Sequence, residues 1–160
     1  MATDPSPPER GGLRAVLDTN APIAAHLSRN PRSPTIELLA RWRAGEFTQL
    51  YSDDMLVELI EKFQARRIAS EACDIYLADL ITLGEYVNVS SEQIPDAIVS
   101  DPDDNVILAC ALVGRATHIV TYDLHFNDCG GIYQGICILD GLHFLYVVRG
   151  DQPPEAQGDT

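Results

Sequence analysis

The sequence predicts an α/β fold in which a parallel sheet is flanked by helices. Short apolar runs of strand length alternate with longer segments whose apolar residues recur at helical spacing. This alternation is typical of parallel sheets, because the crossover between two parallel strands usually contains a helix. The chain has 160 residues, 46% of them hydrophobic, which suits one domain with its own core. We expect that domain to span residues 13–148, between disordered tails at residues 1–12 and 149–160.

The first half of the chain is expected to form two strands and four helices. The apolar run Leu13–Leu17 predicts a buried strand with Asp18 at its C-terminal end. A helix is expected to begin near Ala21, because Pro22 suits a first helical turn. The other elements of this half are a helix over Thr35–Ala44, a strand over Thr48–Tyr51, a helix that follows Ser52 and carries Glu58 among apolar residues, and a helix over residues 70–84.

The second half is expected to add further strands around one apolar helix. Asp101 followed by Pro102 predicts the start of that helix, which runs to about Val113 and ends at Gly114. The segment Glu92–Val99 fits either a strand or irregular structure. The remaining elements are a weak strand at Tyr86–Val89, a strand over His118–Thr121, a loop over residues 124–134, a strand over Ile136–Leu139, and a segment over residues 142–148 that fits a helix or a strand.

Three carboxylates lie within four residues at the start of the apolar helix, at Asp101, Asp103 and Asp104. They repel one another unless a partner offsets their charge. The helix dipole offsets part of this repulsion, and a bound cation can offset the rest. Whether this is a cation site therefore depends on where the other acids of the chain lie.

Acids elsewhere in the chain are expected to meet this cluster. Asp18 and Asp123 each follow a strand, and the C-terminal ends of parallel strands lie at one edge of a sheet. A helix that precedes a parallel strand begins at that same edge, which adds Asp104. Glu58 lies on the apolar side of its helix, where a charge without a partner is costly to bury. No lysine, arginine or zinc-spaced histidine or cysteine accompanies these acids in the sequence, so they predict a site for Mg²⁺ or Mn²⁺.

Charge and cysteine content narrow the classes of function. The net charge is −13, from 24 acids and 11 bases, which argues against binding nucleic acid through bulk charge. Bound metal ions reverse the local sign, so an enzyme that acts on RNA stays compatible with this charge. Seven of the eleven bases lie between residues 29 and 67, where they either line an RNA path or balance surface acids. The four cysteines lack zinc or redox spacing, and no stretch resembles a signal peptide or a membrane span, so we expect a cytoplasmic protein without a membrane partner.

At these residues the chain resembles the PIN-domain ribonuclease family, above all the toxin components of bacterial toxin–antitoxin pairs. The likeness covers about residues 13–146. It implies a three-layer α/β/α sandwich with a central parallel sheet, and an endoribonuclease that depends on Mg²⁺ or Mn²⁺. Four stretches carry it, in matching order and at matching intervals: Val16–Asn20, the helix around Glu58, Asp101–Asn105 with Leu108–Ala111, and Ile119–Asp123.

The resemblance also implies a role for each residue of the site. The family places its third acid about two helical turns before a small residue, here Ala111, which favours Asp104 over Asp101 or Asp103. Many such toxins are blocked by a cognate antitoxin and pair with themselves, so the expected partners are RNA, an antitoxin and a second copy of the chain. The implied catalytic and metal-binding acids are Asp18, Glu58, Asp104 and Asp123, with support from Asn20, Asp101, Asn105 and Thr121.

Departures from the family pattern keep other functions in view. Tyr122 stands before the last acid, where a small residue or an arginine is common, and this predicts a narrower cleft. The first alternative is therefore a PIN-like binding or regulatory module with weak or no catalysis. A phosphatase or phosphoacceptor that uses Asp18 as nucleophile ranks last. The phosphatase needs a second aspartate where the chain has Asn20, and both need a lysine near the pocket, for which the chain has only Lys62.

Overall fold

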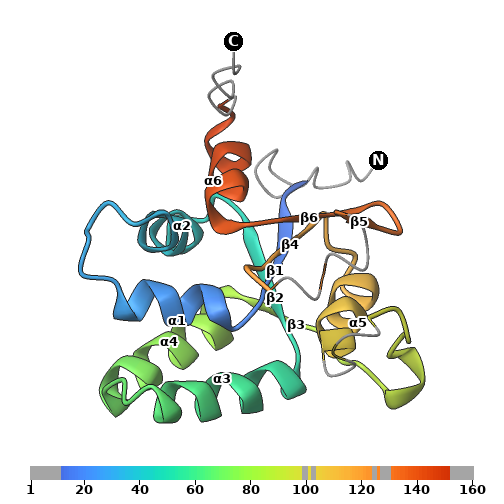
Figure 1. The fold of residues 1–160 in the computed structure, drawn as a ribbon, viewed down its shortest axis with the longest axis horizontal. Coiled ribbons are helices and arrows are strands. Elements are labelled where there is room, and N and C mark those ends of the chain that lie inside the picture. Colours follow the sequence, from blue (N-terminus) through green and yellow to red (C-terminus); the bar gives the residue numbers. More distant parts are fainter. Residues whose placement is uncertain (1–11, 99–100, 102–103, 124–125, 127–130, 152–160) are drawn as a thin grey trace, which may run out of the picture.

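A six-stranded sheet forms the centre of the part of the chain that the structure describes, with the strand order β3-β2-β1-β4-β6-β5 (Figure 1). The strands are β1 (Arg14–Leu17), β2 (Thr48–Tyr51), β3 (Glu85–Tyr86), β4 (His118–Val120), β5 (Ile132–Tyr133) and β6 (Ile136–Leu139). All neighbouring pairs from β3 to β6 are parallel, and β5 pairs antiparallel with β6. The prediction of a parallel sheet is confirmed, with this antiparallel edge strand as the departure.

The structure is a computed structural model and describes residues 12–98, 101, 104–123, 126 and 131–151. The expected disordered tails therefore lie almost wholly outside the described residues, as does Asp103 of the acidic stretch.

Strand β5 lies in a segment that we expected to be a loop. It joins β6 through the two residues Gln134 and Gly135, which have φ angles of 47° and 82°. Positive φ at both central residues is the geometry of the tightest hairpin turns, because it matches the twist of the flanking strands. Each side of this pairing contributes only two residues, too few to leave a period in the sequence.

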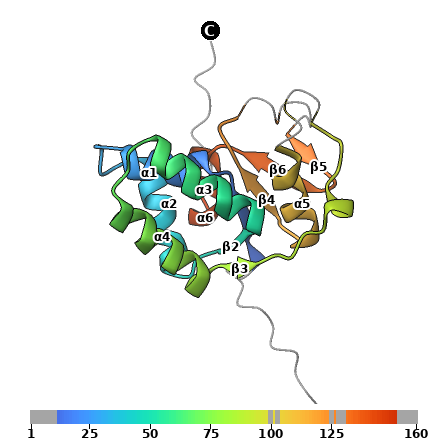
Figure 2. The same cartoon turned by 90° about the horizontal axis from the view of Figure 1, so that it is seen from below.

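Helices cover both faces of the sheet (Figures 1 and 2). One face carries five of the described helices, and the other carries α5, with the segment that leads to it. None of the helices in the described ranges is both long and apolar enough to span a membrane. The helices are α1 (Asn20–Leu27), α2 (Pro34–Arg43), α3 (Asp53–Ala65), α4 (Ser70–Leu83), α5 (Asn105–Val113) and α6 (Gly141–Arg149).

Strand β1 divides the core into its two halves. Ala15 and Leu17 point into the apolar cluster under α1–α4 and α6, whereas Val16 points into the cluster under α5. Alternate side chains of a strand face opposite sides of the sheet, so a strand covered on both sides is apolar throughout. The apolar run that predicted this strand is thus explained, and the three-layer α/β/α sandwich is confirmed.

The start of α5 differs from the prediction. We expected the helix to begin at Asp101 with Asp104 in its third position, but α5 begins at Asn105, and Asp104 is the residue that precedes its first turn. Asn105 is buried, with its side-chain oxygen accepting hydrogen bonds from the backbone of Ala97 (3.2 Å) and Ile98 (2.8 Å). Its side-chain nitrogen donates to the carbonyl of Ile98 at 3.2 Å. Asn105 therefore fastens the segment before the acidic stretch to the helix, instead of offering its oxygen to a ligand.

Two open predictions are also decided. The segment Glu92–Val99 fitted either a strand or irregular structure. It overlaps a short 3-10 helix at Ser91–Gln93, and its described part, up to Ile98, contains no strand. The segment over residues 142–148 is helical and belongs to α6.

Candidate active site

The C-terminal ends of β1 and β4 bring the first acids together. The backbone N–H of Asp18 donates to the carbonyl of Val120 at 2.9 Å, so the pairing of the two strands continues to Asp18. The hydroxyl of Thr121 donates to Asp18 Oδ2 at 2.7 Å, and it accepts a hydrogen bond from the backbone N–H of Asp123 at 2.9 Å. Thr121 thus connects the two strand ends and fixes the orientation of the Asp18 carboxylate.

Asp18 is a carboxylate almost cut off from water, with 2% of its surface exposed. Burial raises its pKa above the ordinary value, since a low-dielectric surrounding disfavours the charged form. The hydrogen bond from Thr121 and the charge of Lys62 act against this rise in pKa, and the charge of Glu58 adds to it. A buried acid of this kind keeps its charge most easily next to a cation.

Glu58, on α3, meets the same site through Thr19 and Lys62. Thr19 is buried, and its hydroxyl donates to Glu58 Oε1 at 3.2 Å. Lys62 Nζ lies 2.8 Å from Glu58 Oε1 and donates to Thr19 Oγ1 at 3.0 Å and to Asn20 Oδ1 at 3.3 Å. These bonds join the middle of α3 to the start of α1, at the end of β1.

Lys62 is the residue of this site that the sequence analysis missed. We expected acids without a neighbouring base, and that expectation is wrong, because the only lysine of the chain lies among them. The signal was present in the sequence, since Glu58 and Lys62 are four residues apart on one helix and such pairs face each other. What the spacing could not show is that the pair points at Asp18.

Three acids act on the charge of Lys62. Burial lowers the pKa of Lys62, but the hydrogen bond to Glu58 and the charges of Glu58, Asp18 and Asp104 raise it, and the net effect is a raised pKa. Asp104 thus belongs to the same electrostatic site as Asp18 and Glu58, and its backbone N–H donates to the carbonyl of Asp101 at 3.1 Å.

Asp123 lies on the side of the site that faces β6. With Tyr122 and Asp140 it lines a hollow of about 280 Å³. Tyr122 is directed to the start of α6, where its hydroxyl lies close to Gly141. The absence of a side chain at Gly141 makes room for the tyrosine hydroxyl, because a Cβ there would lie 2.2 Å from it.

The donor atoms around Lys62 fit a hard cation. Within the described residues, no three side chains of histidine, cysteine, aspartate or glutamate converge closely enough to hold a metal ion by themselves. Among the described contacts of the ammonium are nevertheless three oxygens, from Glu58, Thr19 and Asn20. Oxygen donors suit Mg²⁺ and Mn²⁺. The residues therefore fit such an ion in the position that the ammonium takes, provided that Lys62 moves.

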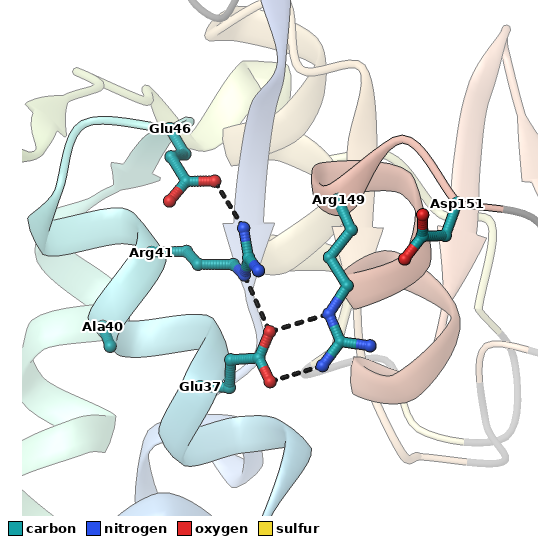
Figure 3. Close-up of a pocket in the computed structure, with 6 residues that line it drawn as sticks. All are labelled: Glu37, Ala40, Arg41, Glu46, Arg149 and Asp151. Atoms are coloured by element: carbon teal, nitrogen blue, oxygen red, sulfur yellow. Dashed lines mark hydrogen bonds and ion pairs between the residues drawn. The ribbon is translucent and has the colours of Figure 1, made fainter.

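A larger hollow, of about 690 Å³, lies elsewhere, between α2 and α6 (Figure 3). Glu37 accepts hydrogen bonds there from Arg41 and Arg149, and Arg41 also donates to Glu46. Glu46 comes just before β2, and Arg149 ends α6, so this hollow lies toward the opposite edge of the sheet from Asp18. Four of its charged residues, Glu37, Arg41, Glu46 and Arg149, are paired with one another, which makes this hollow a structural contact between two helices.

Fold and site together define the class: an α/β protein with buried and half-buried acids at the C-terminal edge of a mostly parallel sheet. The family model described as "PIN domain" matches residues 14–125, about 70% of the chain. The chain belongs to the PIN-domain family.

Two solved structures are similar to the chain in fold. One is the crystal structure of VapBC2 from Rickettsia felis bound to a DNA fragment from their promoter, with a TM-score of 0.54 and 14% identity, covering 79% of this chain and 97% of that one. The other is the crystal structure of FitAcB from Neisseria gonorrhoeae, with a TM-score of 0.53 and 16% identity, covering 81% of this chain and 99% of that one. A comparison with curated protein sequences gave no match.

Proposed function

We propose that this protein is a metal-dependent endoribonuclease that hydrolyses phosphodiester bonds in RNA. One observation carries the proposal: Asp18 and Glu58 meet at Thr19 beside the ends of β1 and β4, where the hydroxyl of Thr19 lies 3.5 Å from Asp18 Oδ1 and 3.2 Å from Glu58 Oε1. PIN domains are a family of nuclease-like hydrolases that generally use divalent metal ions. Carboxylates gathered at one edge of the sheet are what such chemistry needs to bind its metal ion.

Each residue of the site has a part in the proposed reaction. Asp18, Glu58, Asp104 and Asp123 would hold Mg²⁺ or Mn²⁺, together with the oxygens of Thr19 and Asn20 that Lys62 Nζ contacts in the structure. The ion, when bound, lowers the pKa of water so that it can attack the phosphodiester, and it offsets the charge that develops on the phosphate. Thr121 keeps the Asp18 carboxylate in one orientation through its 2.7 Å hydrogen bond.

Supporting residues hold the acids in place. Asn20 offers its side-chain oxygen at the start of α1 and is bonded to Lys62. Asp101 and Asn105 hold the start of α5, where Asp104 lies, through the carbonyl of Asp101 and the side-chain amide of Asn105. We take residues 13–148 as the nuclease domain, with the tails outside it.

We also propose that the protein is the toxin of a toxin–antitoxin pair and works in the cytoplasm. The motifs resemble those of toxin components, and the two similar structures, VapBC2 and FitAcB, align over 97% and 99% of their matched chains. A cognate antitoxin and a second copy of the chain are then its protein partners, besides the RNA substrate.

The substitution Asp18→Asn tests the enzymatic proposal. It keeps the size of the side chain and a hydrogen-bond acceptor for Thr121 but removes the charge, so cleavage of RNA in the presence of Mn²⁺ should fall by at least about 100-fold. Asp74→Asn, at an exposed position of α4, is the matched control and should cut at the parent rate. Circular dichroism and thermal unfolding establish that both variants fold. Parent-level cleavage by folded Asp18→Asn would falsify the assignment.

A binding or regulatory module without catalysis is the second candidate. The specific observation in its favour is the ion pair between Glu58 and Lys62, because it satisfies the acids with a cation from the chain itself. Calorimetry separates the two functions: a folded protein that binds no Mn²⁺ at millimolar concentration would be such a module.

A phosphatase or phosphoacceptor that uses Asp18 as nucleophile remains the lowest-ranked candidate function, although the reason now differs from the one given for the sequence. The lysine that this chemistry requires does lie near Asp18, since its charge acts on the pKa of that residue. The second aspartate of a phosphatase is still missing at Asn20, and the chain belongs to the PIN-domain family.

A further inference from the structure

Lys62 uses its donor capacity fully within the acidic site. An ammonium group has three N–H donors and no acceptor. Its described contacts include three oxygens, from Glu58 at 2.8 Å, Thr19 at 3.0 Å and Asn20 at 3.3 Å. These oxygens come from α3, from α1 and from Thr19, which lies between β1 and α1. The contact is therefore a small, defined cation site and not an isolated ion pair on the surface of one helix.

Lys62 can also leave this position. Its side chain is 37% exposed, and that of Glu58 is 34% exposed, so the ammonium lies at the rim of the site and not in its interior. The long flexible stem of a lysine lets the charged end reach water without moving the backbone. Asp18, in contrast, is buried and held by Thr121, so it cannot follow Lys62 outward.

A divalent ion and the ammonium of Lys62 cannot share these oxygens. Mg²⁺ binds oxygen at about 2.1 Å and Mn²⁺ takes the same kind of donor, so either ion would draw the ligands closer than the 2.8–3.3 Å of the ammonium contacts. Two cations at one position also repel each other strongly. One of them must therefore be absent when the other is bound.

We propose that Lys62 is the resident counter-ion of the acidic site, and that a divalent metal ion binds there by displacing its ammonium group. The inference rests on the proposed function, since it concerns the same site. Lys62 then holds Glu58, Thr19 and Asn20 in place before the metal arrives, and it lowers the apparent affinity of the protein for the metal. It is a positioning residue of the metal-free state.

Calorimetric titration with Mn²⁺ tests the displacement in three variants of the full chain. Lys62→Met removes the charge and keeps a flexible, helix-favouring side chain, so Mn²⁺ should bind at least about tenfold more tightly than to the parent. Lys62→Arg keeps the charge and should stay within about threefold of the parent affinity. Arg115→Met makes the same charge change at an exposed residue before β4, at the opposite edge of the sheet, and should leave the affinity unchanged.

The single lysine gives a second measurement that does not depend on activity. In protein labelled with ¹³C at the lysine ε carbon, one side-chain NMR signal reports on Lys62. Mg²⁺ should move this signal to the position of a solvated lysine, along the same concentration curve as Mg²⁺ binding measured by calorimetry. Glu58→Gln should move the signal the same way without metal.

The outcomes distinguish this inference from the proposed function. Tighter binding to Lys62→Met, together with the metal-dependent shift of the lysine signal, supports displacement. If the parent and Lys62→Met bind Mn²⁺ equally well, displacement is wrong while the metal-dependent function stands. If neither protein binds Mn²⁺, both the displacement and the metal-dependent function are wrong.

Discussion

Glu37 connects α2 to α6, and its removal should weaken the fold in a pH-dependent way. Its carboxylate accepts hydrogen bonds from Arg41 Nε and Arg149 Nε, both at 2.8 Å, and a further one from the second nitrogen of Arg149 (Figure 3). The hydrogen bonds from Arg149 and then Arg41 lower its pKa from 4.5 to about 2. Arg149 is 112 residues away in the sequence, so this contact forms only in the folded chain.

The size of the effect follows from that pKa. At about 1.4 kcal/mol per pKa unit, the full change in the pKa of Glu37 corresponds to about 3 kcal/mol of stability. About a third of the side chain is exposed, where water screens ion pairs to about 0.2–1 kcal/mol each. For a carboxylate held by two arginines, we therefore expect Glu37→Gln to lower the free energy of unfolding by about 1–2 kcal/mol at pH 7.

The pH dependence has a defined sign. A carboxylate whose pKa is lower in the folded state stabilises the protein above the pKa of the unfolded chain, and that stability is lost as the pH falls through 4.5 toward 2. Urea denaturation at pH 7 and at pH 3, on either side of the isoelectric point of 4.4, should show a smaller difference between parent and Glu37→Gln at pH 3. The control Glu46→Gln removes an acid that binds Arg41 but not Arg149, and it should lower the free energy of unfolding by less than Glu37→Gln does. The reasoning would be refuted if Glu37→Gln lowered the free energy of unfolding equally at both pH values, or less than Glu46→Gln does.

Two further substitutions test the packing that supports the site. Gly141→Ala places a Cβ 2.2 Å from the hydroxyl of Tyr122. Because Tyr122 is nearly half exposed and its ring can move, we expect the free energy of unfolding in urea to fall by about 1 kcal/mol and the NMR signal of the tyrosine to change. The double change with Tyr122→Phe should regain most of the loss, and an unchanged tyrosine signal would contradict the contact. Asn105→Ala leaves the buried N–H of Ile98 without its 2.8 Å acceptor, so the free energy of unfolding should fall by about 2–3 kcal/mol. The control Asn88→Ala, at an exposed position, should lower it by about 0.5 kcal/mol or less. Equal losses for the two asparagines would show that Asn105 has no anchoring role.

Strands with a clear apolar pattern were predicted with their positions, because burial on both sides of the sheet leaves a run of apolar residues. Strand β6 begins and ends at the expected residues, Ile136 and Leu139, and β1 ends at Leu17 as expected. Strand β5 left no such run, since two residues become a strand only through their pairing with β6. The start of α5 was misplaced, because Asp101-Pro102 is a strong local signal for a helix start, whereas the long-range bonds of Asn105 to residues 97 and 98 are invisible in the sequence.

The sequence by itself determined which end of the sheet carries the acids. Asp18 follows a strand, and in parallel sheets every strand ends at the same edge, so its place required only the order of the elements. Tertiary structure alone decided what lies between those acids. Whether the pair Glu58 and Lys62 faces solvent or the end of β1 depends on how α3 passes α1, and contacts of about 3 Å across that crossing are set by packing of the whole chain. For that reason the acidic edge was predictable, and the lysine beside its acids was not.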